Sequence, residues 1–168
     1  LGASPLHYRA ESDICEIESL LREAFGYELL HCLAMNTTTE ALAELGSAEL
    51  NIVLAAEALP CAEYLQSVTG TPYVYLPPYG YSQTTEFLKS VAAVINQPVK
   101  EAMRQRLEEK NRRLKMLLNS PLLSRIPGTV FLKGNYDTVK GLGAFFKEFK
   151  FNVAHSVCTH KITGTAAE

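Results

Sequence analysis

The residues of this chain that could bind a metal stand near its carboxyl end, where two histidines flank a cysteine. Imidazole nitrogens and thiolates are ligands that zinc prefers, so His155, Cys158 and His160 suggest a metal site. In an extended strand, however, residues at an odd spacing point to opposite faces, which separates His155 from Cys158. We therefore assign no metal ligands here.

The cysteines of the chain stand far apart and include no Cys-x-x-Cys pair, so neither a zinc ribbon nor a thioredoxin-like motif is available. Most of them fall within apolar-patterned segments. We expect buried, inert thiols at all four positions, which are Cys15, Cys32, Cys61 and Cys158.

Residues 133–137, Lys-Gly-Asn-Tyr-Asp, pass from a predicted strand into a predicted helix. Backbone N–H groups at such a helix N-terminus can bind an anion. The run lacks Gly-x-Gly-x-x-Gly spacing and the P-loop lysine, so turn chemistry explains it more simply. No Ser, His and Asp set lies in a nucleophile-elbow context, and we assign no catalytic residue.

The best candidate for a binding site is the edge where two predicted strands end, at residues 55–57 and 77–82. Parallel strands joined by helices leave their ligand crevice at the carboxyl ends of the strands. We expect contacts to a cofactor or substrate from six residues at this edge, namely Ser4, Glu57, Pro78, Tyr79, Gly80 and Ser82.

The elements that must position this edge form a β-α-β unit. Residues 50–54 are a short apolar run with β-branched members, which is typical of a strand buried on both faces. A helix is predicted over residues 58–69, and Gly70 ends it. Residues 73–76 are strand formers that stop at two prolines. The inward face of the helix is predicted to carry Leu59, Ala62, Leu65 and Val68.

Helices and strands also alternate before and after this unit. Capping-box spacing predicts helices that start at Asp13 and Thr37, with a strand over residues 29–34 between them. Ser82 is expected to cap a helix that runs to residue 95. An amphipathic helix is predicted over residues 99–118, with a solvated basic cluster at Arg112, Arg113 and Lys115.

A second, smaller β-α-β unit is predicted from a strand at residues 129–132, a helix at 137–149 and a strand at 151–157. So short a unit buries little apolar area alone. We expect exposed apolar surface at Phe145, Phe146 and Phe149, and hence a homo-oligomer. Residues 162–168 are expected to be disordered.

The fold class predicted is therefore α/β, with a parallel-sheet, Rossmann-like (doubly wound) three-layer domain over residues 1–97. A connecting helix and loop follow over residues 98–126, and a partial Rossmann-like unit with a disordered tail over residues 127–168.

Composition narrows the classes of function. Sixteen basic against eighteen acidic residues give a net charge of -2, which offers no case for nucleic acid or an anionic membrane as partner. No apolar run approaches the roughly 20 residues that span a bilayer. We expect a cytoplasmic protein, and the opening Leu-Gly-Ala-Ser-Pro, with no signal-peptide pattern, suggests an excised or processed piece.

Several landmarks of the chain together resemble the nitrogenase component 1 family. They are Gly-Ala-Ser-Pro, Asp13 before a helix that ends at Gly26, Ala-Glu-Leu-Asn-Ile-Val-Leu, Gly-Thr-Pro-Tyr, Pro-Pro-Tyr-Gly and Thr-Glu-Phe-Leu. That family includes the molybdenum-iron protein, its assembly scaffolds and the protochlorophyllide and chlorophyllide reductases, with three Rossmann-like domains per subunit. Residues 1–97 resemble most of the middle domain, and residues 98–161 the connecting helix and the opening of the last.

The resemblance implies a fragment of a nitrogenase-like oxidoreductase that receives electrons from an ATP-dependent iron-sulfur reductase and pairs with a second component 1 type subunit. The full-length parent would use an iron-sulfur cluster, metallocluster or bound tetrapyrrole, whereas this fragment would hold no cofactor and be inactive alone. Where cofactor-binding members place a cysteine after Asn-x-Val, this chain has Leu54, Ala55 and Ala56. The alternative is a non-catalytic α/β module that binds a small molecule or docks a partner, with tyrosines lining a pocket.

Overall fold

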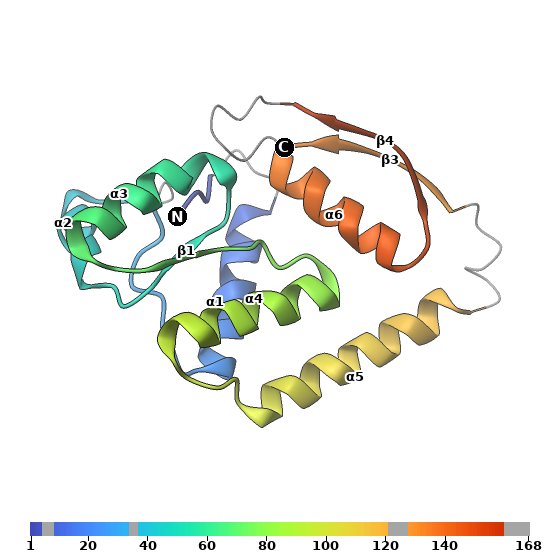
Figure 1. Ribbon diagram of the computed structural model, residues 1–168, viewed down its shortest axis with the longest axis horizontal. Helices are drawn as coiled ribbons and strands as arrows, with labels where there is room; N and C mark the ends of the chain where they lie inside the picture. The colour runs from blue at the N-terminus through green and yellow to red at the C-terminus, as the bar shows by residue number, and fades with distance from the viewer. Residues whose placement is uncertain (5–8, 34–36, 121–127, 160–168) are drawn as a thin grey trace.

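The computed structural model describes residues 1–4, 9–33, 37–120 and 128–159 (Figure 1). Helices and short strands alternate through these residues. In chain order they are α1 (Ala10–Ala24), α2 (Thr39–Ala43), the 3₁₀ helix η1 (Leu45–Ser47), β1 (Asn51–Val53), the 3₁₀ helix η2 (Ala56–Ala58), α3 (Leu59–Thr69), β2 (Tyr73–Tyr75), α4 (Gly80–Ile95), α5 (Glu101–Leu118), β3 (Thr129–Gly134), α6 (Tyr136–Glu148) and β4 (Asn152–Cys158).

Two small parallel sheets, each of two strands, organise the described residues. In the first β-α-β unit (residues 51–75), β1 pairs with β2 so that Asn51 lies opposite Tyr73, and α3 makes the crossover. In the second β-α-β unit (residues 129–158), β3 pairs with β4 and α6 makes the crossover. Parallel pairing with helical crossovers confirms the predicted mixed α/β class.

The main hydrophobic core lies around α4. Phe87 and Val91 have no exposed side-chain surface, and Leu88 is almost as deeply buried. Their partners come from α1, β2 and α5. Helix α4 therefore joins the first sheet to α1 and α5. The buried partner residues are Ala24, Phe25, Val74, Met103 and Leu107.

Two helix boundaries follow the sequence closely. Gly70 ends α3 in the left-handed conformation, at φ +77°, as predicted. At the start of α6, the Asn135 side chain accepts a hydrogen bond from the Thr138 N–H.

Three predicted caps were wrong by one to four residues. The first helix begins at Ala10, so Asp13 lies within its first turn. Thr38 rather than Thr37 caps α2, because its side chain accepts the Ala41 N–H at 3.2 Å. The fourth helix begins at Gly80, which leaves Ser82 exposed in its first turn and not at the cap.

The predicted strand over residues 29–34 was also wrong. Residues 29–33 form no strand in the structure, and residue 34 lies outside the described part. Among the described residues no neighbouring strand offers this segment a hydrogen-bonded ladder, and a strand exists only through such pairing. Leu29 and Leu30 remain about half exposed. On α3, Val68 was predicted to face inward but is 64% exposed.

The aromatic side chains of α6 are better packed than predicted. Phe145, Phe146 and Phe149 are half-buried, and their rings meet edge to face with centroids 5.1 to 5.5 Å apart. The exposed apolar surface of the second β-α-β unit lies instead on the sheet face away from α6, at Phe131 and Val157. The tail predicted to be disordered lies outside the described residues.

No helix in the described ranges has the length and apolar character needed to cross a bilayer. The longest helix, α5, is too polar, since it carries many charged residues and buries only Met103 and Leu107. Met116 and Leu117 near its end are more than 60% exposed.

Candidate functional site

The carboxyl end of the first sheet faces the start of α6. Figure 1 shows α6 lying between its own sheet and the first β-α-β unit. Asp137, in the first turn of α6, is 6% exposed. One carboxylate oxygen accepts the Ala56 N–H at 2.9 Å, and the other accepts the Tyr75 hydroxyl at 2.6 Å. The edge predicted to form a crevice is therefore closed by a helix of the second β-α-β unit.

Two of the predicted site residues pack directly on α6. The Tyr79 hydroxyl lies 3.2 Å from the Thr138 hydroxyl, and the Tyr79 ring covers Gly141 so closely that a Cβ there would overlap it. Gly80 has φ +73°, and a Cβ at this position would come within 2.5 Å of the Phe145 ring. These glycines allow α4 and α6 to approach closely.

The remaining predicted residues lie on elements around the same end of the sheet. Pro78 is half-buried and precedes α4, and Ser82 is exposed in its first turn. Glu57 is exposed on η2, directly after the β1 strand end. Ser4 follows the Gly2 backbone, which packs against the end of β1. Their contacts to a cofactor or substrate stay a prediction.

The phenols at this end are held in the neutral form. Burial, followed by the hydrogen bond to Asp137, raises the pKa of Tyr75. Burial also raises the pKa of Tyr79. Because both groups stay protonated at neutral pH, neither acts as a general base, and the Tyr75 hydroxyl donates to Asp137. The arrangement is suited to fixing the two β-α-β units relative to each other.

The described residues do not fit a metal cluster. Within the described ranges, no three His, Cys, Asp or Glu side chains gather as a ligand set. The prediction of buried thiols was wrong for three cysteines, since Cys15, Cys61 and Cys158 are exposed, while Cys32 is partly buried and burial raises its pKa. After β1 the chain carries Leu54, Ala55 and Ala56, none of which offers a ligand atom.

The histidine and cysteine of β4 are separated as predicted. His155 stacks on Phe131, with ring centroids 5.6 Å apart, on the exposed face of the second sheet. Cys158 instead lines a shallow hollow beside Lys140 of α6. His160 lies outside the described residues.

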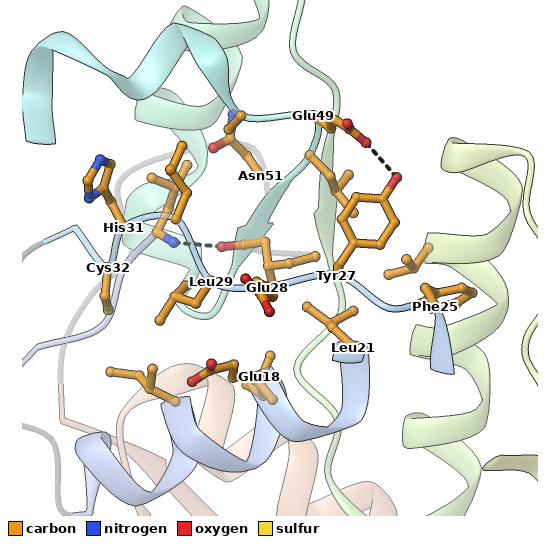
Figure 2. Close-up of a pocket in the computed structure, with 18 of the residues that line it drawn as sticks. Glu18, Leu21, Phe25, Tyr27, Glu28, Leu29, His31, Cys32, Glu49 and Asn51 are labelled. Carbon is orange, nitrogen blue, oxygen red and sulfur yellow. Dashed lines mark hydrogen bonds between the residues drawn. The ribbon is translucent and has the colours of Figure 1, made fainter. Parts of the chain in front are cut away.

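A larger cavity lies on another side of the first sheet, and we call it the β1 groove. It has a volume of about 610 Å³ and runs between α1, residues 25–33 and residues 45–54. Figure 2 shows Glu18 and Leu21 of α1 on one side of the extended segment and Asn51 of β1 on the other. Most of its lining is apolar, including Ile14, Ile17, Leu29, Leu30, Leu50 and Ile52.

Polar groups of the β1 groove are mostly paired at its rim. The Tyr27 hydroxyl donates to Glu49 at 2.8 Å, and His31 lies 2.9 Å from Glu44 (Figure 2 shows the first of these). The exception is the side-chain nitrogen of Asn51, which is buried without a described hydrogen-bond partner. The sequence does not predict this groove, and the one local signal for it is an asparagine inside an apolar strand.

Comparisons with known proteins agree on one family. The family model described as nitrogenase component 1 type oxidoreductase matches residues 2–167. The chain is similar to a subunit of the light-independent protochlorophyllide reductase of Synechococcus sp. (strain JA-3-3Ab), with 35% identity over 98 residues, 58% of this chain and 19% of the relative.

Two further relatives are the same subunit of that reductase in other organisms. That of Methylocella silvestris is 37% identical over 93 residues, 55% of this chain and 18% of its own. That of Rubrivivax gelatinosus is 29% identical over 135 residues, 80% of this chain and 23% of its own. The chain thus spans about a fifth of the length of the curated relatives it matches.

Proposed function

Because the chain belongs to the nitrogenase component 1 type oxidoreductase family, we propose that it is part of a nitrogenase-like oxidoreductase. In the full-length protein, electrons would come from an ATP-dependent iron-sulfur reductase. The observation that supports this proposal is the match across residues 2–167, which takes in both β-α-β units and the helix between them.

The substrate we propose is a tetrapyrrole, reduced while it is bound to the assembled protein. Support comes from the relatives, which are named as subunits of a light-independent protochlorophyllide reductase. The same names favour assembly with a second component 1 type subunit. Reduction at a protein-bound metallocluster is the other possibility within this family.

The role proposed for this chain is that of a scaffold. The described residues offer no cluster ligand set, so any iron-sulfur cluster would be held by other parts of the full-length protein. Residues 1–97 would form most of a Rossmann-like, three-layer domain, residues 98–126 a connector, and residues 127–168 part of a second such domain. Of the six residues predicted to contact a cofactor or substrate, Glu57 and Ser82 are exposed and would make such contacts directly. Ser4, Pro78, Tyr79 and Gly80 are partly buried, and Tyr79 and Gly80 would contribute by positioning α4 against α6.

The experiment that tests this proposal is iron and acid-labile sulfide analysis of the anaerobically purified full-length protein, beside the same analysis of the 168-residue chain. We expect iron and sulfide in the first sample and neither in the second. A protochlorophyllide titration of the full-length protein, followed by absorbance, tests the substrate. Absence of metal and of pigment binding in the full-length protein would overturn the proposal.

A second candidate function is a non-catalytic module that binds a small molecule or docks a partner. The β1 groove favours it, because its volume of about 610 Å³ lies within the range of ligand pockets and its lining is mostly apolar. Under this alternative, the full-length protein would lack metal while the isolated chain would bind an apolar ligand in the groove.

A further inference from the structure

Two hydrogen-bond donors of the first β-α-β unit converge at the carboxyl end of its sheet. The Ala56 N–H follows β1, and the Tyr75 hydroxyl belongs to the last residue of β2. They donate to different oxygens of the Asp137 carboxylate, at 2.9 Å and 2.6 Å. The two donors therefore match the two oxygens of a single carboxylate, and we call this pair the carboxylate cradle.

Both donors of the cradle are positioned by the first unit alone. β1 and β2 pair in parallel with Val53 opposite Tyr75, so the two strands end side by side. The turn after β1 is closed by a hydrogen bond from the Ala58 N–H to the Ala55 carbonyl at 3.0 Å. Without Asp137 the cradle would keep its geometry, but its donors would lose their acceptor, which is costly for the buried Ala56.

The group that fills the cradle comes from a different part of the chain. Asp137 lies on α6 and is 6% exposed. Further contacts hold α6 against α4: the Tyr79 hydroxyl lies 3.2 Å from the Thr138 hydroxyl, and the Gln83 side chain donates to the Gly141 carbonyl at 3.0 Å. Helix α6 therefore covers the cradle, and another ligand would reach it only when α6 moves.

The donors and charges of the cradle favour a carboxylate over other ligands. A metal cation needs acceptor atoms, and the cradle offers hydrogens instead. Burial, followed by the hydrogen bond to Asp137, raises the pKa of Tyr75, so its hydroxyl keeps the proton that it donates. The charge of the exposed Glu57 acts on the same hydroxyl and disfavours a phosphate group, which carries roughly two negative charges at neutral pH. A carboxylate carries one charge and gives each donor an oxygen.

We propose that the carboxylate cradle is a binding site for a carboxylate-bearing ligand, and that Asp137 fills it from within the chain while α6 covers it. Parallel α/β sheets bind their ligands outside the carboxyl ends of the strands, which is where the cradle lies. Asp137 satisfies the two donors until a ligand takes its place. The inference concerns the chemical group that this end of the sheet accepts, and it does not depend on the reaction proposed above.

The test removes the internal carboxylate and supplies a free one. Asp137→Ala deletes only the carboxylate group of the side chain, so formate is a probe of matching size. Thermal unfolding of the complete 168-residue chain is followed by circular dichroism in sodium formate and in sodium chloride of equal ionic strength. We expect about 200 mM formate to raise the unfolding midpoint of Asp137→Ala by about 2–4 °C over chloride, with saturation at higher concentration.

Three control variants show whether formate acts at the cradle. Asp137→Asn keeps a side chain of the same size in place, so formate should give it no advantage over chloride. Asp137→Ala combined with Tyr75→Phe lacks the hydroxyl donor and should lose most of the formate effect. Glu57→Ala removes a neighbouring but exposed carboxylate and should respond to formate no more than the wild type.

Amide hydrogen exchange locates the bound formate. In Asp137→Ala, formate should slow exchange of the Ala56 N–H at least roughly tenfold, because this N–H donates to the carboxylate in the wild type. If Asp137→Ala is unfolded in chloride, recovery of the folded spectrum in formate would support the proposal equally. Equal stability in both salts, a chain unfolded in both, or the same formate effect in Asp137→Asn would overturn it.

Discussion

The Asp137 carboxylate accepts the Tyr75 hydroxyl across 2.6 Å and so ties the start of α6 to the end of β2. Its other oxygen accepts the Ala56 N–H just after β1. A buried carboxylate is costly unless its oxygens are hydrogen-bonded, and here each has a partner from the first β-α-β unit. This one side chain therefore fixes where the second unit sits on the first.

Tyr75→Phe should destabilise the chain by about 1.5–3 kcal/mol, because it leaves one oxygen of a buried carboxylate without its donor. Urea unfolding measures the loss. The matched control is Tyr73→Phe on the same strand, which should change the free energy of unfolding by less than about 0.5 kcal/mol. Equal effects of the two substitutions would show that the bond to Asp137 contributes nothing.

The same tyrosine predicts an alkaline loss of stability. Its pKa is raised above the ordinary value of 10 in the folded chain, so the stabilisation is fully present below pH 10 and is lost as the pH rises through the raised value. Thermal unfolding followed above pH 10 should decline more steeply for the wild type than for Tyr75→Phe. Parallel declines would contradict the assignment of this pH dependence to Tyr75.

The close contact between α4 and α6 can be tested with two glycines of one helix. A Cβ at Gly141 would overlap the Tyr79 ring, whereas one at Gly143 would meet Leu132 at an ordinary 3.6 Å. Gly141→Ala should cost about 1–3 kcal/mol. Gly143→Ala should be neutral or stabilise by up to about 1 kcal/mol, since alanine favours helix.

A double-variant cycle completes this test. The cost of Gly141→Ala should shrink when Tyr79→Ala is also present, because the overlap is then removed. Urea titration of the wild type, the two single variants and the double variant gives the four free energies of unfolding. An unchanged cost in the double variant would mean that Gly141 is required for a reason other than the Tyr79 ring.

The sequence predicted the positions of helices and strands better than the long-range contacts between them. Apolar runs and Gly70 correctly located the two strands of the first sheet and the helix between them, because those signals act over a few residues. The landmarks Gly-Ala-Ser-Pro and Pro-Pro-Tyr-Gly correctly indicated the family. The strand predicted at residues 29–34 failed because strand formation depends on a distant neighbour that periodicity does not reveal.

The sequence placed Tyr79 and Gly80 at the carboxyl ends of the strands, but it did not predict what covers that end of the sheet. Tyr79 and Gly80 do lie at the carboxyl ends of the strands, yet their partners are Thr138 and Phe145, about 60 residues later in the chain. Residues 133–137 predict only a turn into a helix, because nothing local to them shows that the Asp137 carboxylate reaches Ala56. Long-range pairing of this kind is invisible to motif spacing.

The ion pair between Glu23 of α1 and Arg106 of α5 predicts a small acid dependence. The hydrogen bond from Arg106 lowers the pKa of Glu23 below its ordinary 4.5, so the stabilisation is present above pH 4.5 and is lost as the pH falls through the lowered value. Because both side chains are exposed to solvent, Arg106→Gln should lower the free energy of unfolding by only about 0.5 kcal/mol at neutral pH.

The control for this ion pair is Arg104→Gln. Arg104 pairs with Glu101 within α5 alone, so its loss should not affect the packing of α1 on α5. Urea midpoints at pH 7 and pH 3 give the comparison. If Arg106→Gln lowers the urea midpoint as much at pH 3 as at pH 7, the loss of stability does not come from the Glu23 charge.

The exposed face of the second sheet predicts self-association of the chain. Phe131 is 70% exposed and stacks on His155, and Val157 on the same face of β4 is 53% exposed, so two apolar side chains of this face contact water. Phe131→Lys should shift sedimentation at high protein concentration towards the monomer, since burying a lysine between two copies is unfavourable. Tyr64→Lys, at a 66% exposed position on α3, is the matched control and should leave the distribution unchanged. A wild-type chain that stays monomeric by light scattering would show that this face does not bind a second copy.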